Sequence, residues 1–157
     1  MANSAFVNAA ISSCETEVQG MQDLTFDQVA IGDGLPEFIT APISRTTLAL
    51  YAGASADHNP LHIDSDFAKS AGMTDVFAHG MLSMAYLAQL LTRWVRQEQI
   101  ISWRVRFLSI TPLHAQVVCS GEIIEKIAGE KQVKLAIKAK IKDGADTLAG
   151  EALVRLP

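Results

Sequence analysis

A short polar segment, ASADHNPLHID at residues 54–64, lies between two apolar runs of the sequence. It contains Asp57 and His62, separated by Pro60, a residue that breaks helices and favours turns. If this loop folds back on itself, a carboxylate and an imidazole can hold one water molecule between them. Imidazole groups exchange protons near neutral pH. The spacing therefore indicates general acid–base chemistry on a bound water molecule.

A second motif, Ala78-His79-Gly80-Met81-Leu82, begins 16 residues after His62 at the start of an apolar run. A helix that begins near Gly80 would offer unpaired backbone N–H groups and the positive end of its dipole to a negatively charged oxygen. A glycine at that point permits a close approach. Each motif also has a structural interpretation, because Asp57 could cap a turn and a buried histidine such as His62 or His79 could bond only to backbone.

Helical patterns dominate the first half of the chain. We expect a short edge strand at residues 36–43, and a helix at residues 45–55 for which Ser44 is the N-cap. A short helix is expected at residues 65–72. The segment at residues 80–97 is apolar on nearly every face over its first four turns, which predicts a buried helix.

The second half of the chain changes to a period of two, which is typical of half-buried strands. Strands are expected at residues 100–110, 115–127, 133–141 and 147–157, and Asp143-Gly144 is a strong hairpin signal between the last two. These segments predict an antiparallel meander. One buried helix followed by one-sided strands indicates a single α+β domain in which the sheet wraps the helix.

Composition excludes several classes of function. The chain has 157 residues, 49% hydrophobic and 19% charged, with a net charge of −4 and no cluster of basic residues, so nucleic acid and anionic membranes are not expected partners. Cys14 and Cys119 form no metal or disulfide pattern, which suits the cytoplasm. No membrane-spanning run is present. Residues 1–20 are expected to form a loosely ordered extension, and residues 21–157 the domain.

The two motifs together resemble the signature of MaoC-like R-specific enoyl-CoA hydratases and hydroxyacyl-thioester dehydratases. The resemblance extends in diluted form from about Phe26 to Pro157. The residues that carry it are Asp57-His58-Asn59-Pro60-Leu61-His62, Phe67-Ala68, Gly72 and Ala78-His79-Gly80-Met81-Leu82. This resemblance implies a hot-dog fold, in which a long central helix is wrapped by an antiparallel sheet.

The resemblance also implies an activity, the reversible hydration of trans-2-enoyl thioesters to (R)-3-hydroxyacyl thioesters. Asp57 and His62 would activate the water and deliver it and the proton to the same face of the double bond, and the Gly80 N–H would stabilise the thioester oxygen. Supporting roles near the substrate or in the loop fall to Asn59, Pro60, His79, Met81 and Ser83. The substrate carrier is CoA or an acyl-carrier protein, no metal or redox cofactor is expected, and exposed sheet edges favour a homodimer.

Three alternatives stay open. The chain could be a (3R)-hydroxyacyl-carrier-protein dehydratase of fatty-acid synthesis, a hot-dog thioesterase, or a non-catalytic acyl-binding subunit. The basic row from Lys134 to Lys142 could meet substrate phosphates, although a solvated sheet face explains it more simply. His58 and His114 are expected at the surface.

Three departures from the family pattern bear on these expectations. Ala56 stands where a glycine is common, a change expected to cost little if the backbone there is ordinary. Some members carry a serine where this chain has Ala88, and Ser83 lies only one turn past Gly80, which weakens a serine role. The segment FLSITPLHAQ, at residues 107–116, lacks the Gly-Asp that closes the corresponding region of the family.

Overall fold

The computed structural model describes residues 24–157, so the expected extension at residues 1–20 and Cys14 lie outside the described residues. The α-helices are α2 (Arg45–Ser55), α3 (Ser65–Ser70) and α4 (Gly80–Trp94). The strands are β1 (Phe38–Ile39), β2 (Ile100–Phe107), β3 (Val117–Ile127), β4 (Gln132–Ile141) and β5 (Asp146–Arg155). Short 3-10 turns are η1 (Phe26–Gln28), η2 (Pro60–His62), η3 (Gln97–Gln99) and η4 (Ala128–Glu130). Among the described residues, no helix is long and apolar enough to cross a membrane.

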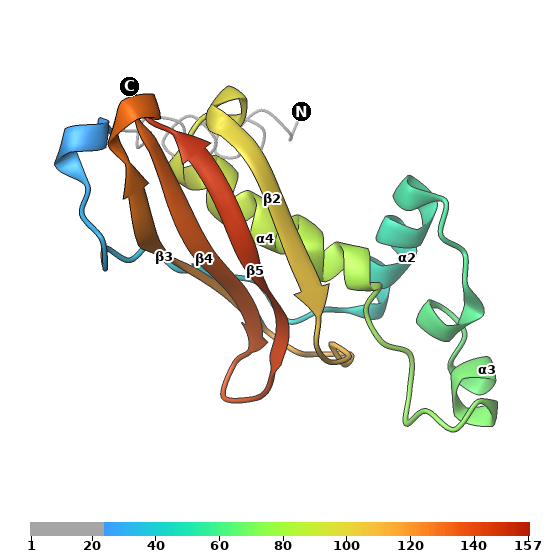
Figure 1. Ribbon diagram of the computed structural model, residues 1–157. Helices are drawn as coiled ribbons and strands as arrows, with labels where there is room; N and C mark the ends of the chain where they lie inside the picture. Colours follow the sequence, from blue (N-terminus) through green and yellow to red (C-terminus); the bar gives the residue numbers. More distant parts are fainter. Residues whose placement is uncertain (1–23) are drawn as a thin grey trace, which may run out of the picture.

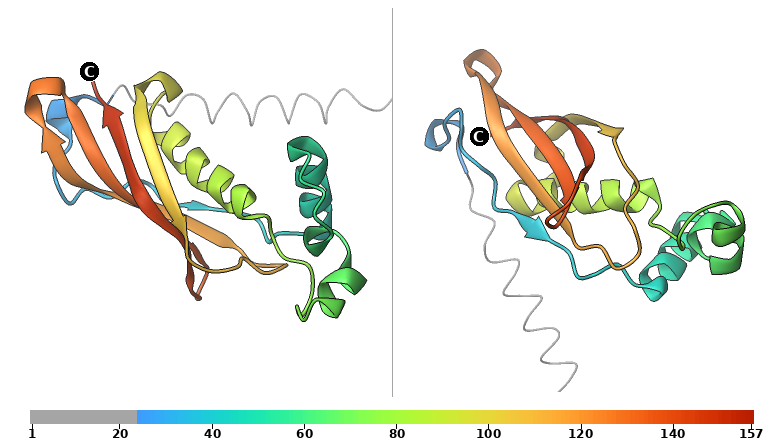
Figure 2. Two further views of the ribbon diagram at one scale, coloured as in Figure 1. Left: turned by 45° about the vertical axis from the view of Figure 1, so that its right-hand side comes forward. Right: turned by 90° about the horizontal axis from the view of Figure 1, so that it is seen from below.

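The five strands form one antiparallel sheet that curves around α4 (Figures 1 and 2). Alternate residues of β4 form its inner face, and Val133, Leu135, Ile137 and Ala139 are buried as the period of two predicts. Cys119 lies opposite Ala139 and is fully buried, and this burial raises the pKa of its thiol to about 12. The predicted α+β architecture is thereby confirmed.

The strand order differs from a simple meander in the position of β2. The order is β1-β3-β4-β5-β2, so β3, β4 and β5 form a meander while β2 pairs with β5 at the far edge. This order results from the connection at residues 108–116, which passes the start of α4 and leads the chain from β2 at one edge of the sheet to β3 near the other edge. The connection is held there by an isolated bridge between Phe77 and Pro112 and by the Ala78 N–H, which donates to the Thr111 carbonyl.

The central helix α4 is buried on one face rather than on nearly every face. Leu82, Leu87, Leu90 and Leu91 are buried, whereas Met81 at the first turn is 53% exposed. A single sheet covers only one side of a helix, which leaves the opposite side of α4 partly open in one chain. The helix also ends at Trp94, three residues before the predicted end, because Val95 adopts an extended conformation.

A separate group of short helices stands beyond the N-terminal end of α4 (Figures 1 and 2). This helical lobe, residues 45–77, contains α2, η2 and α3. The Arg45 guanidinium binds the Asp75 carboxylate at 2.6 Å, and the Ser65 hydroxyl donates to the same carboxylate, so the start and end of the lobe are joined. The backbone N–H of Val76, the Ser65 hydroxyl and the Arg45 guanidinium together lower the pKa of Asp75.

Candidate active site

The loop that carries Asp57 begins where α2 ends. Ser44 caps the helix by accepting a hydrogen bond from the Thr47 N–H at 3.0 Å, as its sequence position predicts. At the other end, Ala56 adopts a left-handed conformation with φ 58°. The expectation that alanine costs little here assumed ordinary backbone, and the structure contradicts that assumption. A left-handed conformation places Cβ against the following carbonyl oxygen and costs an alanine roughly 1–2 kcal/mol.

Substitution of Ala56 by glycine is therefore expected to stabilise the protein. Glycine removes the left-handed strain but gains conformational freedom in the unfolded chain, so the net increase in the free energy of unfolding is about 0.5–1 kcal/mol. Urea denaturation measures it. Ala54→Gly is the matched control, because Ala54 lies within α2, where glycine costs about 1 kcal/mol. Equal destabilisation by both variants would contradict the strain at Ala56.

Two side chains shape the rest of the loop. The Asp57 carboxylate accepts a hydrogen bond from the Asn59 N–H at 3.3 Å, and the Asn59 side chain accepts one from the Leu61 N–H at 3.1 Å. Pro60 then begins the 3-10 turn η2, whose last residue is His62. These local bonds turn the chain back on itself, and so Asp57 and His62 come onto the same side of the loop.

The orientation of His62 is fixed by a backbone carbonyl from a distant segment. Its Nδ1 lies 2.8 Å from the Phe77 carbonyl oxygen, which can only accept, so Nδ1 is the donor. The Phe77 ring packs edge-on against the imidazole at 4.8 Å between ring centroids. In the neutral imidazole the other nitrogen, Nε2, then carries a free lone pair.

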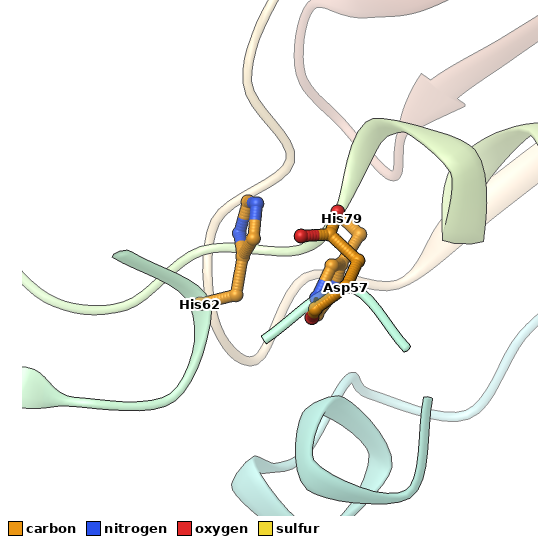
Figure 3. A group of neighbouring side chains, drawn as sticks. All are labelled: Asp57, His62 and His79. Carbon is orange, nitrogen blue, oxygen red and sulfur yellow. Dashed lines mark hydrogen bonds between the residues drawn. The ribbon is translucent and has the colours of Figure 1, made fainter. Parts of the chain in front are cut away.

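His79 stands behind Asp57 as the N-cap residue of α4 and is only 1% exposed. Its Nε2 donates to the backbone carbonyl of Asp57 at 3.0 Å, so it holds the loop by its main chain. Its ring lies against that of His62, with 3.9 Å between the ring centroids and the two planes tilted by 31°. Figure 3 shows His62 and His79 gathered around Asp57, and the side-chain ligand atoms of the three residues lie within 4.8 Å of one another.

Tyr51 of α2 completes the surroundings of the loop. Its ring lies 5.0 Å from that of His79, and its backbone carbonyl accepts a hydrogen bond from the Ser55 hydroxyl, which in turn accepts from the Asp57 N–H. Burial and, secondly, the negative charge of Asp57 raise the pKa of the Tyr51 hydroxyl. Tyr51 is therefore a protonated, neutral neighbour of the carboxylate at physiological pH.

Gly80 begins α4 immediately beside this cluster, and its N–H has no partner within the helix. A Cβ on Gly80 would lie 2.9 Å from Cε1 of the Phe107 ring, so a side chain at this position would require that ring to shift. The ring itself is 54% exposed. The glycine thus lets the Phe107 ring of β2 lie directly against the helix start.

A cavity of about 300 Å³ opens next to Gly80. Neither Asp57 nor His62 lines it, whereas Phe77, whose ring packs against that of His62, does. Ser83 lies in its wall, 2% exposed, and its hydroxyl is 3.0 Å from that of Thr111. Ser83 therefore ties α4 to the connection at residues 108–116. Met81 is on the exposed side of the same helix turn.

The structure brings together Asp57, His62, His79 and Gly80, which the sequence motifs named, and leaves His58 and His114 exposed. Sequence reasoning missed Tyr51, Phe77, Phe107 and Thr111. Their contacts join segments far apart in the chain, and the only local signal was that Phe77 precedes the second motif directly.

Comparisons with known proteins support the expected family. The chain matches the family model described as "MaoC like domain" over residues 26–145. It is 34% identical over 133 residues to the (R)-specific enoyl-CoA hydratase of Rhodospirillum rubrum, covering 81% of this chain and 89% of that protein. The structure resembles the R-hydratase PhaJ1 from Pseudomonas aeruginosa with a TM-score of 0.77 and 24% identity, covering 87% of this chain and 88% of the other. This likeness confirms the hot-dog fold.

Other relatives are much longer. The chain is 27% identical over 135 residues to the fatty acid synthase subunit beta of Saccharomyces cerevisiae, a match that covers 83% of this chain but 6% of that protein. A domain of this type thus occurs both as most of a small protein and as a small part of a large one.

Proposed function

Because the chain belongs to the MaoC-like domain family, whose members among its relatives are hydratases and dehydratases, we propose that it hydrates trans-2-enoyl thioesters reversibly to (R)-3-hydroxyacyl thioesters. The observation that supports this activity most directly is the placement of Asp57 and His62. Two proton-accepting groups from one loop converge beside the free N–H of a helix start. A hydro-lyase acting on a conjugated thioester needs these elements.

The proposed reaction begins with a water molecule between Asp57 and His62. Both the carboxylate and the His62 Nε2 are acceptors, so the water directs its two hydrogens toward them and a lone pair toward the β-carbon of the substrate. One O–H bond breaks as the proton passes to this pair, and a C–O bond forms at the β-carbon. The electrons of the double bond move toward the thioester oxygen, which becomes enolate-like.

The Gly80 N–H is the proposed donor to that oxygen. It lies at the positive end of the α4 dipole and, as the first helical N–H, has no competing partner within the helix. The enolate then takes the proton back at the α-carbon from the same pair, which completes addition to one face of the double bond. Dehydration is the reverse sequence, and its extent is set by the substrate.

Supporting roles follow from the contacts around the pair. We propose that Asn59 and Pro60 maintain the loop, that His79 positions the Asp57 backbone, and that Ser83 anchors α4. The cavity beside Gly80 is the proposed acyl site, with Met81 at its exposed approach. No metal or redox cofactor takes part in these steps, and CoA or an acyl-carrier protein carries the substrate.

We propose that two copies of the chain form the working enzyme. Within residues 24–157, strand β2 pairs only with β5, and the exposed apolar residues near its open edge and the start of α4 include Met81, Ile101, Phe107 and Leu108. A long unpaired edge beside apolar residues is stabilised when a second copy covers it.

The test uses purified protein with trans-2-enoyl-CoA esters of increasing acyl length, followed by the loss of the ultraviolet absorbance of the conjugated thioester. We expect hydration that gives the (R)-3-hydroxyacyl product. In light scattering, we expect the protein to have a mass of twice 16.9 kDa, which is that of a dimer. Release of CoA without hydration would instead identify a thioesterase. If no CoA ester is turned over but the corresponding carrier-protein esters are, the dehydratase of fatty-acid synthesis is the correct assignment, and turnover of neither would contradict the proposal.

A further inference from the structure

The cluster of Asp57, His62 and His79 offers ligands for a metal ion as well as groups for acid–base catalysis. The three residues reach one point from the loop after α2, from η2 and from the N-cap of α4, with ligand-type atoms within 4.8 Å of one another. Two imidazoles and one carboxylate are a common set of protein ligands for zinc.

The hydrogen bonds of the two histidines prepare them for coordination. His62 donates through Nδ1 to the Phe77 carbonyl at 2.8 Å, and His79 donates through Nε2 to the Asp57 carbonyl at 3.0 Å. Each neutral imidazole therefore presents its other nitrogen as a lone pair. Histidines that bind metals have the same arrangement, in which the nitrogen away from the metal donates to a carbonyl or carboxylate.

The lone pair of His79 has a further property. Its Nδ1 is the one buried side-chain nitrogen or oxygen within residues 24–157 that has no hydrogen-bond partner. A buried polar atom left without a partner costs roughly 1–3 kcal/mol. This atom is hidden from solvent, because His79 is only 1% exposed. A bound cation would satisfy it.

The geometry needs a small adjustment to hold an ion. Zinc–nitrogen bonds of about 2.0–2.1 Å in a tetrahedral site place two ligand atoms roughly 3.3 Å apart, which is less than the largest separation of 4.8 Å in the cluster. The two histidines are buried and held by backbone bonds, whereas Asp57 is exposed. Its carboxylate can move by a side-chain rotation. The two imidazole rings, 3.9 Å apart between centroids, must also tilt away from each other, because two ring nitrogens bound to one tetrahedral ion hold their rings farther apart.

We propose that Asp57, His62 and His79 form an inhibitory site for a divalent transition-metal ion, with Zn²⁺ as the preferred ion. The ion takes the place of the water between Asp57 and His62. It binds the lone pairs of these two residues that would otherwise accept protons from the water. Nitrogen ligands select Zn²⁺ or Co²⁺ over Mg²⁺ or Ca²⁺, which prefer oxygen. The inhibition rests on the proposed hydratase function, whereas the binding of the ion does not.

Binding is tested on metal-free wild-type protein by competition with a chromophoric zinc indicator. One Zn²⁺ per chain is expected, with no effect of a large excess of Mg²⁺. His79→Gln is the decisive variant, because the glutamine amide can still donate to the Asp57 carbonyl while the Nδ1 ligand is lost. Its Kd for Zn²⁺ is expected to rise by at least about 10–100-fold, the loss typical of removing even a residue that only supports a metal ligand.

Two further variants make this result interpretable. His58→Gln removes an exposed histidine next to Asp57 but outside the cluster, and its Kd should equal that of the wild type. Asp57→Asn keeps an oxygen to accept from the Asn59 N–H, loses the charge, and should weaken Zn²⁺ binding even if His79→Gln does not fold. An unchanged Kd in Asp57→Asn, or an equal loss in His58→Gln, would overturn the site.

The activity assay separates this inference from the proposed function. Zn²⁺ should abolish hydration at the concentration at which it binds, and a chelator should restore it. If the metal-free protein hydrates enoyl-CoA but binds no Zn²⁺, the metal site is wrong and the function stands. If one Zn²⁺ binds but no thioester is hydrated, the function is wrong and the binding site stands. An increase in activity on Zn²⁺ binding would overturn the inhibitory role.

Discussion

Substitution of Asp57 by asparagine, or of His62 by asparagine, is expected to lower kcat for enoyl-thioester hydration by about 10²–10⁴-fold, the contribution typical of a positioned acid or base. Asp57→Asn keeps an oxygen to accept from the Asn59 N–H but cannot take a proton from water. His62→Asn keeps an amide that can donate to the Phe77 carbonyl and loses Nε2. Each variant thus removes the proposed chemical group while preserving the local bond that shapes the loop.

The double variant provides the sharper measurement. If Asp57 and His62 activate one water together, removal of the second group should cost little beyond removal of the first, because residues that act as a unit are strongly non-additive. His58→Gln is the control and should retain wild-type kcat, since this exposed side chain lies outside the cluster. Independent, multiplicative losses would refute a shared water, and retention of more than about a tenth of kcat in either single variant would refute the pair.

The largest expected effect on stability comes from Gly150→Ala. Gly150 of β5 lies opposite Val105 of β2, and a Cβ at this position would clash with the Arg104 carbonyl oxygen and come 2.8 Å from the Val105 Cα. Both contacts are with backbone, so no change of rotamer relieves them and the two strands must separate. The free energy of unfolding should fall by about 3 kcal/mol or more, the range of severe overpacking.

Denaturant unfolding measures this loss as a lower midpoint. Gly129→Ala is the matched control, because a Cβ on Gly129 meets nothing within 4 Å and its effect should stay within about 0.5 kcal/mol. Equal midpoints for the two variants would show that β2 can shift away from β5 without cost. Since β2 also carries Phe107 over Gly80, the Gly150→Ala variant should disturb the start of α4 as well.

Local signals in the sequence predicted most of the elements. The cap at Ser44, the turn at Asp143-Gly144 and the period of two in β4 each depend on neighbours in the chain, and the corresponding elements are present in the structure. The position of β2 could not be obtained in this way. It depends on the connection at residues 108–116 bonding to Phe77 and Ala78, which are remote in sequence.

In the candidate site too, features set by neighbouring residues could be predicted from the sequence, and features set by distant contacts could not. The spacing of Asp57 and His62 about a proline was enough to bring them together, because bonds within the loop shape it. The conformation of Ala56 was not predictable, since it depends on the direction in which the chain must leave α2. The contact between the rings of His79 and His62 and the position of Phe107 over Gly80 depend on packing between separate segments.

The helical lobe is a peripheral part of the fold, although its Leu48, Ala68 and Val76 belong to the same hydrophobic core as α4 and the sheet. Asp57 and His62 lie within the lobe, whereas Gly80 belongs to α4 and the sheet. Peripheral units of this kind open locally at a lower free energy than global unfolding. Local opening of the lobe would move Asp57 and His62 away from Gly80 while the sheet stays folded, so we expect the lifetime of the proposed site to depend on the stability of the lobe itself.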